Sequence, residues 1–364
     1  MSTTPAVTVL MAVHNGARDL RAAIESILAQ TFADFEFLIV DDGSDDGSRE
    51  IVASYPDPRI RRIDNERNLG LSASLNRGLA AAAGELVARQ DADDISEPSR
   101  LATQVRFLMQ HPDTAVVGSW YTKIDADGVE LGRRELPADP VAIRWAMLFH
   151  CPLVHSAVTF RRGLLARTTG FYDESFAYAQ DYELWSRVAR RLPMANVPAY
   201  LLRLRVSPWS MTATYGERTL EGPRVSLANI GALRGSGQGP SAGYAGRLAV
   251  MQALLLGGAL PDDASEGGGA GLADAIREIL TLHDDFRRAE GLERGAGDAL
   301  RRDVEARVAG RLLALAAEPA SARSGRAGAL LGAAWRVRPS ALASTAGVRA
   351  AVRAGVGALA GRGA

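Results

Sequence analysis

The feature that most constrains the fold is an alternation of short apolar runs and helix-periodic segments over the first 110 residues. Apolar runs predict buried strands at residues 6–13 and 35–40, and a third and a fourth strand are expected at residues 60–63 and 86–89. The segments that follow them predict helices at residues 18–30, 48–55, 71–83 and 100–110. Gly84 stands just after the third of these helices and is expected to cap it. Strands joined by helices form a parallel sheet with right-handed crossovers, so we expect a Rossmann-like α/β domain.

Polar clusters follow three of the four predicted strands. They occupy residues 14–16, 41–46 and 91–94. Ligands of such sheets bind at the carboxyl ends of the strands. We therefore expect the three clusters to meet in one crevice.

The pattern changes after residue 115 and again near residue 215. A strand at 116–124, a turn at 125–128 and a return strand at 129–131 are expected first. Further elements are expected as helices at 141–149 and 181–191 and a short strand at 157–160. Beyond the second break, helices are predicted at 244–256, 273–283 and 299–317. The sequence thus predicts an α/β domain over 1–215, a linker over 216–240 and a helical C-terminal region over 241–364.

Composition excludes several classes of protein. The 42 basic and 42 acidic residues balance, which gives no overall attraction to nucleic acid. No apolar run reaches the ~18–20 residues of a membrane span, and the run at 6–13 is too short for a signal peptide. The single cysteine, Cys151, cannot form an internal disulfide. A reducing, cytoplasmic location is therefore expected.

The C-terminal tail is strongly basic. Residues 319–364 hold seven arginines, no acidic residue and many Ala and Gly residues. One interpretation is a basic amphipathic surface that contacts anionic lipid at the inner face of a membrane. The other is a small helical appendage with a solvated basic face, because the glycines weaken its helices.

The Asp91-Ala92-Asp93 sequence carries the clearest chemistry. It follows an apolar strand, and alternate residues of an extended segment share a face, so both carboxylates can approach one ion. Mg²⁺ and Mn²⁺ prefer oxygen ligands and leave positions open for phosphate oxygens. An isolated D-x-D is more often an acidic surface turn. The second acidic cluster upstream, at 41–46, favours a cation site.

These residues lead to a family resemblance. Five segments resemble family 2 glycosyltransferases of the GT-A fold, in the family's order, at residues 9–15, 38–46, 68–72, 90–94 and 179–185. The resemblance implies a mixed, mainly parallel sheet flanked by helices, with the C-terminal helices as an appendage. It also implies inverting transfer of a sugar from a UDP-, dTDP- or GDP-linked donor to a glycan or lipid-linked acceptor, with Mn²⁺ or Mg²⁺ as cofactor.

The resemblance also implies roles on the donor side. Asp91 and Asp93 match the metal motif, and Asp93 is the better candidate for direct metal contact. The other donor-binding positions are Val13, Asn15, Asp41, Asp42, Asn68, Gly70, Asp91 and Arg205. Of these, Asp41 and Asp42 match the pair that reads the base and ribose, although either can instead cap the turn before Gly43. Arg205 can pair with phosphate or with a carboxylate, and Ser207 stands where the family often has His.

On the acceptor side, Asp181 matches the catalytic base that takes the proton of the attacking hydroxyl. The family often has Glu-Asp at this point, whereas this chain has Gln180-Asp181. His155, Gln180 and Trp185 are weaker acceptor-side candidates, because a lone His or Trp is more often structural.

Two other functions compete with this one. A nucleotide-sugar-binding scaffold without catalysis would keep the fold, and only Gln180 favours it. The other is a nucleotidyltransferase or a dinucleotide-binding enzyme. A dinucleotide-binding enzyme would need a G-x-G-x-x-G turn and a sugar nucleotidyltransferase a glycine- and lysine-rich loop, and residues 14–17 have neither.

Overall fold

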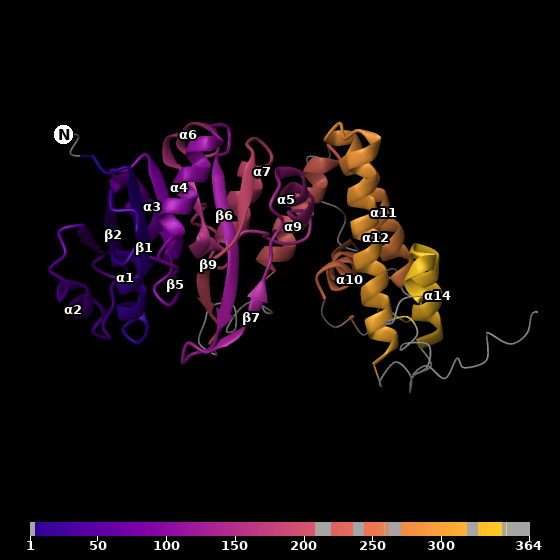
Figure 1. The fold of residues 1–364 in the computed structure, drawn as a ribbon, viewed down its shortest axis with the longest axis horizontal. Helices are drawn as coiled ribbons and strands as arrows, with labels where there is room; N and C mark the ends of the chain where they lie inside the picture. The colour runs from indigo at the N-terminus through magenta and orange to yellow at the C-terminus, as the bar shows by residue number, and fades with distance from the viewer. Residues whose placement is uncertain are drawn as a thin grey trace, which may run out of the picture. The chain divides into compact units, whose positions relative to one another are not determined.

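The computed structural model describes residues 4–207, 220–235, 244–257, 260–261, 271–318, 327–343 and 347. It divides into two compact units, Met1–Ser226 and Leu227–Ala364. The first unit contains the sheet, and the second is helical (Figure 1).

The first half of the sheet is parallel, as predicted. Its strands lie in the order β3-β2-β1-β4 and span Val7–Val13 (β1), Phe35–Asp41 (β2), Ile60–Asp64 (β3) and Leu86–Gln90 (β4). The helices that alternate with them are Leu20–Leu28 (α1), Ser48–Ala53 (α2), Leu71–Ala81 (α3) and Arg100–Gln110 (α4). Because all four strands run the same way, the polar residues that follow them lie at one edge of the sheet.

Alternate residues of β1 enter different hydrophobic layers. Leu10 packs in a layer with Leu75 and Leu79 of α3. Met11 packs in the other layer, with Ile24 of α1 and Leu101 of α4. Since helices cover both faces, β1 is buried along its whole length and does not alternate between buried and exposed residues.

The second half of the sheet is mixed. It comprises Ile95–Ser96 (β5), Val116–Ile124 (β6), Glu130–Arg134 (β7), Thr159–Arg161 (β8) and Met194–Arg205 (β9). Strand β8 joins β4 to β6 in antiparallel fashion, β9 runs parallel to β6, and β5 and β7 pair antiparallel with β9 and β6. The complete nine-stranded sheet has the order β3-β2-β1-β4-β8-β6-β9-β5 with β7 beside β6, and most of its paired residues lie in parallel ladders.

Three helices and a 3-10 turn surround this half of the first unit. They are Pro140–Ala146 (α5), His155–Ala157 (η1), Arg162–Thr168 (α6) and Gln180–Ala189 (α7). Helix α5 begins at Asp139, whose side chain accepts a hydrogen bond from the Ala142 amide. Helix α7 begins one residue before the predicted range of 181–191 and ends two residues before its end, whereas α6 was not predicted.

The largest difference from the predicted elements is β9. Its sequence contains Pro198, which cannot donate to a ladder and disfavours a strand assignment. The structure accommodates the proline at an irregularity, where the pairing shifts between Ser119↔Val197 and Trp120↔Tyr200. A bulge thus allows a strand that local sequence does not reveal.

Gly84 does not cap α3. The helix ends at Ala81, and the capping position is Ala82. A Cβ atom at Gly84 would lie 2.4 Å from the backbone nitrogen of Thr8. The glycine is therefore required by the close approach of the chain to β1, not by the end of the helix.

The helices after β9 are Glu221–Leu233 (α9), Tyr244–Leu256 (α10), Leu272–Ala289 (α11), Arg294–Ala316 (α12) and Ala327–Val337 (α14), followed by a 3-10 segment, Pro339–Ala343 (η3). The predicted linker over 216–240 does not hold for α9. Pro223 lies in the first turn of α9, where a missing N–H costs no helical hydrogen bond, so it does not break the helix. No helix in the described part of the chain is long and apolar enough to cross a membrane.

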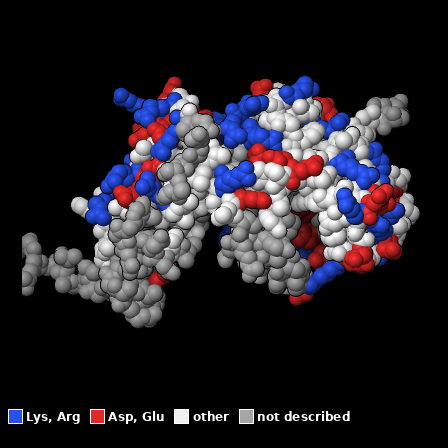
Figure 2. Space-filling view, turned by 180° about the vertical axis from the view of Figure 1, so that it is seen from behind, with Lys and Arg blue, Asp and Glu red and all other residues white. Residues whose placement is uncertain are grey.

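Acidic and basic side chains are interspersed over the face shown in Figure 2, in keeping with the zero formal net charge. Of the basic tail, only 327–343 and 347 belong to the described residues, so most of its arginines lie outside them.

Candidate active site

The loops after β1 and β2 are joined by hydrogen bonds. The amides of Asn15 and Gly16 donate to the hydroxyls of Ser44 and Ser48, both at 3.0 Å. The Asn15 side chain accepts from the Asp45 amide at 3.0 Å, and Asn15 itself has a left-handed φ of 52°. Asparagine tolerates that conformation better than most residues. The first two polar clusters therefore form one connected surface, as expected.

The third cluster adjoins the first. A Cβ atom at Gly16 would lie 3.5 Å from the Cβ of Ala92 and only 2.8 Å from a methyl of Val13. A larger residue at 16 would thus crowd both loops. Val13 has 2% of its surface exposed and packs in the core, so its side chain supports the floor rather than lining an open pocket.

Asp42 anchors the loop that leads from β3 to α3. One carboxylate oxygen accepts from the Asn65 side chain at 2.7 Å and the Leu69 amide at 2.8 Å. The other accepts from the Gly70 amide at 2.9 Å. Asp42 is 3% exposed, so its carboxylate serves this loop rather than an open base pocket. The turn before Gly43 is capped by Asp41, which accepts from the Ser44 amide, and not by Asp42, whose contact with a base stays a prediction.

Asp41 is likewise engaged by the protein. Its Oδ1 accepts from the Ser44 amide at 3.0 Å and from Nε of Arg49 at 2.7 Å. Burial acts to raise the pKa of Asp41, but the hydrogen bonds from Arg49 and Ser44 outweigh it, and the pKa is lowered. Its Oδ2 is buried and has no hydrogen-bond partner among the described residues.

Asn68 and Gly70 lie where a loop must turn into α3. The Asn68 side chain accepts from the Gly70 amide at 2.9 Å, and Gly70 has a left-handed φ of 92°. Asn68 is exposed and its neighbour Leu69 has 46% of its surface exposed. The turn that leads into α3 is enough to explain the geometry of Asn68 and Gly70. Contact of either residue with the donor stays a prediction.

The acidic cluster after β4 separates into three roles. Asp91 forms an ion pair with Arg89, whose side chain is fully buried. Asp94 is buried and accepts from the hydroxyl of Ser156 and from the Arg205 amide at 2.8 Å. Asp93 remains partly exposed between them. Asp94 thus fixes the loop, and Asp91 and Asp93 remain as candidates for binding.

The two candidate carboxylates differ in pKa. Burial tends to raise the pKa of Asp91, but the adjacent guanidinium of Arg89 reverses this and the pKa is lowered. Burial and the charge of Asp91 raise the pKa of Asp93 to about 6. A carboxylate in this state gains from a nearby cation, which would favour its ionised form.

These residues fit a divalent cation that arrives with phosphate ligands. Among the described residues, no group of three or more His, Cys, Asp and Glu side chains could hold a metal ion alone. Asp91 and Asp93 supply hard oxygen ligands from one side, which leaves further positions for phosphate oxygens and water. The geometry therefore fits a cation shared with a ligand better than a resident structural metal.

Asp181 lies in the first turn of α7, directly after the Gln180 position. Its Oδ1 accepts from the Tyr182 amide at 2.7 Å. Burial raises the pKa of Asp181 to about 6, the charge of Asp91 adds to the rise, and Arg89 opposes it. Asp91 acts on Asp93 in the same way. Asp91 is therefore near enough to act on both Asp93 and Asp181, although Asp181 comes from a distant part of the chain.

The weaker acceptor-side candidates have different environments. A ring nitrogen of His155 lies 2.8 Å from the hydroxyl of Tyr172, and burial lowers the pKa of His155 to about 3. His155 is thus a neutral hydrogen-bond partner. Gln180 is 4% exposed, and its Oε1 has no partner among the residues described.

Two predictions for this region are corrected by the structure. Trp185 is fully buried and packs on Phe160 in the core, so it does not offer a face to an acceptor. Arg205 is also buried; its guanidinium donates to the carbonyls of Asp93, Asp125 and Ala126 and lies 3.3 Å from a carboxylate oxygen of Asp19. The carboxylate alternative considered for Arg205 is therefore the observed one.

Arg89 and Tyr172 are residues that sequence reasoning missed. Arg89 faces Asp91, and its charge also acts on His155, Tyr172 and Asp181. The available signal was an arginine inside an otherwise apolar strand, since a charge in such a strand must find a buried partner. Tyr172 carried no comparable signal, because it lies in an irregular loop.

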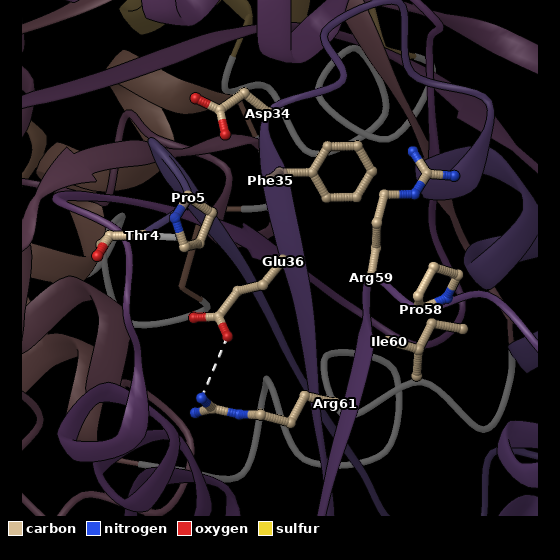
Figure 3. Close-up of a pocket in the computed structure, with 9 residues that line it drawn as sticks. All are labelled: Thr4, Pro5, Asp34, Phe35, Glu36, Pro58, Arg59, Ile60 and Arg61. Carbon is tan, nitrogen blue, oxygen red and sulfur yellow. Dashed lines mark ion pairs between the residues drawn. The ribbon is translucent and has the colours of Figure 1, made fainter. Parts of the chain in front are cut away.

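A pocket of about 430 Å³ lies elsewhere, at the amino ends of β2 and β3 (Figure 3). Both of its arginines are already paired: Arg59 with Asp57 at 2.8 Å, and Arg61 with Glu36 at 3.3 Å. Because ligands of these sheets bind at the carboxyl ends of strands, this pocket is not the site assembled above.

Comparison with known proteins agrees with this geometry. The profile of "Glycosyl transferase family 2" matches residues 8–165. The putative glycosyltransferase EpsE of Bacillus subtilis is 37% identical over 191 residues, which are 51% of this chain and 68% of EpsE. The amylovoran biosynthesis glycosyltransferase AmsE of Erwinia amylovora is 29% identical over 63% of this chain and 89% of its own.

Among solved structures, S. aureus TarS 1–349 in complex with UDP-GlcNAc has the same fold. The TM-score is 0.54 at 16% identity, and the match covers 96% of this chain and 92% of the TarS chain. The GT-A fold expected from the sequence is thereby confirmed. On the combined strength of its motifs, its fold and these relatives, the chain belongs to glycosyltransferase family 2.

Proposed function

We propose that the chain transfers a sugar, with inversion at the anomeric carbon, from a nucleotide-diphosphate sugar to a hydroxyl group. The observation that carries the proposal is that Asp91, which follows β4 together with Asp93, acts electrostatically both on Asp93 and on Asp181 at the start of α7. A transfer of this kind needs negative groups on both sides of the reacting carbon, to hold a cation at the diphosphate and to accept a proton from the acceptor.

Asp181 is proposed as the general base. As the acceptor oxygen bonds to the anomeric carbon, its proton passes to the Asp181 carboxylate, and the bond from that carbon to the diphosphate breaks. A base with a pKa of about 6 is mostly ionised at neutral pH and still basic enough to take a proton. Burial of Asp181 thus suits this role.

Asp93, with Asp91, is proposed to hold Mn²⁺ or Mg²⁺ against the donor. When bound, the cation would neutralise charge on the leaving diphosphate. Arg89 keeps Asp91 ionised and fixed in place through their ion pair. Asn15, Asp41, Asn68 and Gly70 belong to loops at the same edge, and their contacts with the nucleoside stay predictions.

The relatives support the class of substrate. TarS 1–349 was solved with UDP and with UDP-GlcNAc, which supports a nucleotide-sugar donor here. The AmsE name supports synthesis of a polysaccharide. We propose that the donor is a UDP-, dTDP- or GDP-linked sugar and that the acceptor is a glycan or is lipid-linked. We also propose that the enzyme works at the inner face of a membrane.

The test is nucleotide-sugar binding by thermal shift and calorimetry, with Mn²⁺ or with EDTA. We expect one donor class to raise the melting temperature only with the metal, since a ligand at ~100 times its Kd adds about 2.7 kcal/mol. Asp93→Asn should remove that metal-dependent gain. Asp64→Asn is the control, because Asp64 ends β3 at the same edge but is exposed and paired with Arg62.

Metal-independent affinity, or an unchanged gain in Asp93→Asn, would contradict the cation role. Binding by the wild-type chain without turnover of any donor, even with acceptor mixtures, would favour the scaffold function instead.

A further inference from the structure

The loop before Asp181 is held in place by contacts from other parts of the chain. The Asn76 side chain of α3 donates to the Tyr172 carbonyl at 3.0 Å and accepts from its amide at 3.1 Å. The Ser72 hydroxyl donates to the Phe176 carbonyl at 3.1 Å. These contacts fix the loop up to residue 176. The last three residues before α7 need a different anchor.

That anchor is the carboxylate of Glu221, the first residue of α9. It accepts from three consecutive amides, those of Ala177 at 3.1 Å, Tyr178 at 2.9 Å and Ala179 at 2.9 Å. Burial would raise the pKa of Glu221, but these hydrogen bonds outweigh it and the pKa is lowered. Bonds from amides to an ionised carboxylate are stronger than neutral ones. The three amides are thus bound by one charged group from over 40 residues away in sequence.

Helix α7 has no cap of its own at this end. Its capping residue is Ala179, which has no side-chain acceptor. Ala177 and Tyr178 are exposed, so without Glu221 their amides would lose the carboxylate acceptor and turn to water. Asp181 lies two residues beyond Ala179. A shift of the turn therefore shifts the proposed base.

The start of α9 is itself firmly seated. The Arg224 guanidinium lies 5.2 Å above the ring of Phe176, and Val225 is buried in the core. The Ser226 hydroxyl lies 2.9 Å from the hydroxyl of Tyr182 in α7. Because these contacts fix α9 against the same loop and helix, Glu221 is presented from a rigid base.

From these contacts we infer that Glu221 is a positioning residue, which holds the 177–179 turn so that Asp181 faces the reacting hydroxyl. This inference rests on the proposed role of Asp181. A base displaced by about 1 Å can lose on the order of a hundredfold in rate. Donor affinity should be unaffected, because Asp91 and Asp93 lie on another segment.

The test compares Glu221→Ala, Glu221→Gln and the wild-type full chain. Hydrogen exchange of the 177–179 amides should speed up at least tenfold in Glu221→Ala. With the donor of strongest thermal shift among UDP-GlcNAc, UDP-glucose and GDP-mannose, kcat for transfer or donor hydrolysis should fall about ten- to a hundredfold at unchanged donor affinity. Glu221→Gln keeps one acceptor oxygen and should retain more activity than Glu221→Ala.

Glu174→Ala is the matched control. Glu174 lies exposed in the same loop and accepts from the Asn76 side chain instead of from backbone amides. It should alter neither kcat nor the exchange of residues 177–179. Faster exchange in Glu221→Ala with normal kcat would overturn the positioning role, and unchanged exchange would overturn the anchor itself. Full turnover in Asp181→Asn would instead refute the proposed base, while the exchange result would still judge the anchor.

Discussion

Asp93 and Asp94 are neighbours in the chain, yet their carboxylates lie in different environments. Asp94 is buried and bound to Ser156 and the Arg205 amide, whereas Asp93 keeps a partly exposed carboxylate with a pKa raised to about 6. Asp41 and Asp42 are both occupied by protein donors. At this scale, function depends on which carboxylates the protein has left available.

Asp181→Asn tests the proposed role of Asp181 as the general base. Transfer should fall by about 10² to 10⁴ while UDP binding persists, because only the proton acceptor is lost. In the wild type, transfer should decline as the pH falls through about 6, where Asp181 takes up a proton. Turnover in Asp181→Asn equal to the wild type would remove Asp181 from the mechanism.

The same substitution should change stability in the opposite direction. The pKa of Asp181 is raised in the folded state, so its contribution is complete below about pH 4 and is lost as the pH rises through about 6. Asp181→Asn escapes this loss and should be more stable than the wild type at pH 7 by about 1–2 kcal/mol. Melting curves at pH 4.5 and pH 7.5 measure the difference, which should be clearly smaller at the lower pH and vanish only below about pH 4.

Sequence reasoning found the acidic positions but not their partners. Asp91, Asp93 and Asp181 could be singled out because their motifs are local. The partners of Asp42 lie in a loop after β3, and those of Arg205 lie after β1, after β4 and in the β6–β7 turn. Contacts of this kind depend on the tertiary fold, which no local pattern encodes. Trp185 was misjudged for the same reason.

At the scale of elements, the regular β/α alternation was predictable and the irregular half was not. The helix α4 and the strand β6 have the predicted bounds. The spacing of the apolar residues shows which side of each element is buried, and that spacing is visible in the sequence. Strand β9 and helix α9 contain prolines and were missed. A bulge and a first-turn position make those prolines acceptable, and neither is visible before the fold is known.

Gly84→Ala tests the close approach between the α3–β4 connection and β1. The added methyl would lie 2.4 Å from the Thr8 nitrogen and 2.7 Å from the Val7 carbonyl carbon, both backbone atoms that cannot rotate away. We expect a loss of about 1–3 kcal/mol in the free energy of unfolding. Chemical denaturation measures it.

Gly222→Ala is the control for that substitution. Gly222 lies in α9 with open space around its Cβ position, so alanine should stabilise the helix by about 0.5–1 kcal/mol. If both substitutions changed the free energy of unfolding equally, close contact with β1 would not be the reason for a glycine at position 84.

At the scale of the whole molecule, the chain combines a catalytic sheet unit with a helical unit of unassigned role. In the helical unit, Trp335 has 56% of its surface exposed on α14, next to the exposed Arg336. An aromatic residue beside basic ones suits the boundary of an anionic bilayer. Membrane contact through this unit is part of the proposal above.

Vesicle sedimentation of the full chain tests that contact. Binding to vesicles containing phosphatidylglycerol should exceed binding to pure phosphatidylcholine and weaken with salt. Arg336→Gln should reduce it by about fivefold, the equivalent of ~1 kcal/mol per basic residue. Met109→Ala, which removes another exposed apolar side chain, should not. Equal binding to both lipids would contradict the proposed membrane contact.

The central claim is that Asp91 and Asp93 hold a cation against the donor diphosphate and that Asp181 faces the same reaction centre as the base. Anomalous diffraction from a crystal grown with Mn²⁺ and UDP measures this most directly. The account predicts a manganese peak ~2.1 Å from an Asp93 oxygen, bridged to the diphosphate, with Asp181 facing the same cavity. A nucleotide bound without manganese, or a peak in the pocket at the amino ends of β2 and β3, would contradict it.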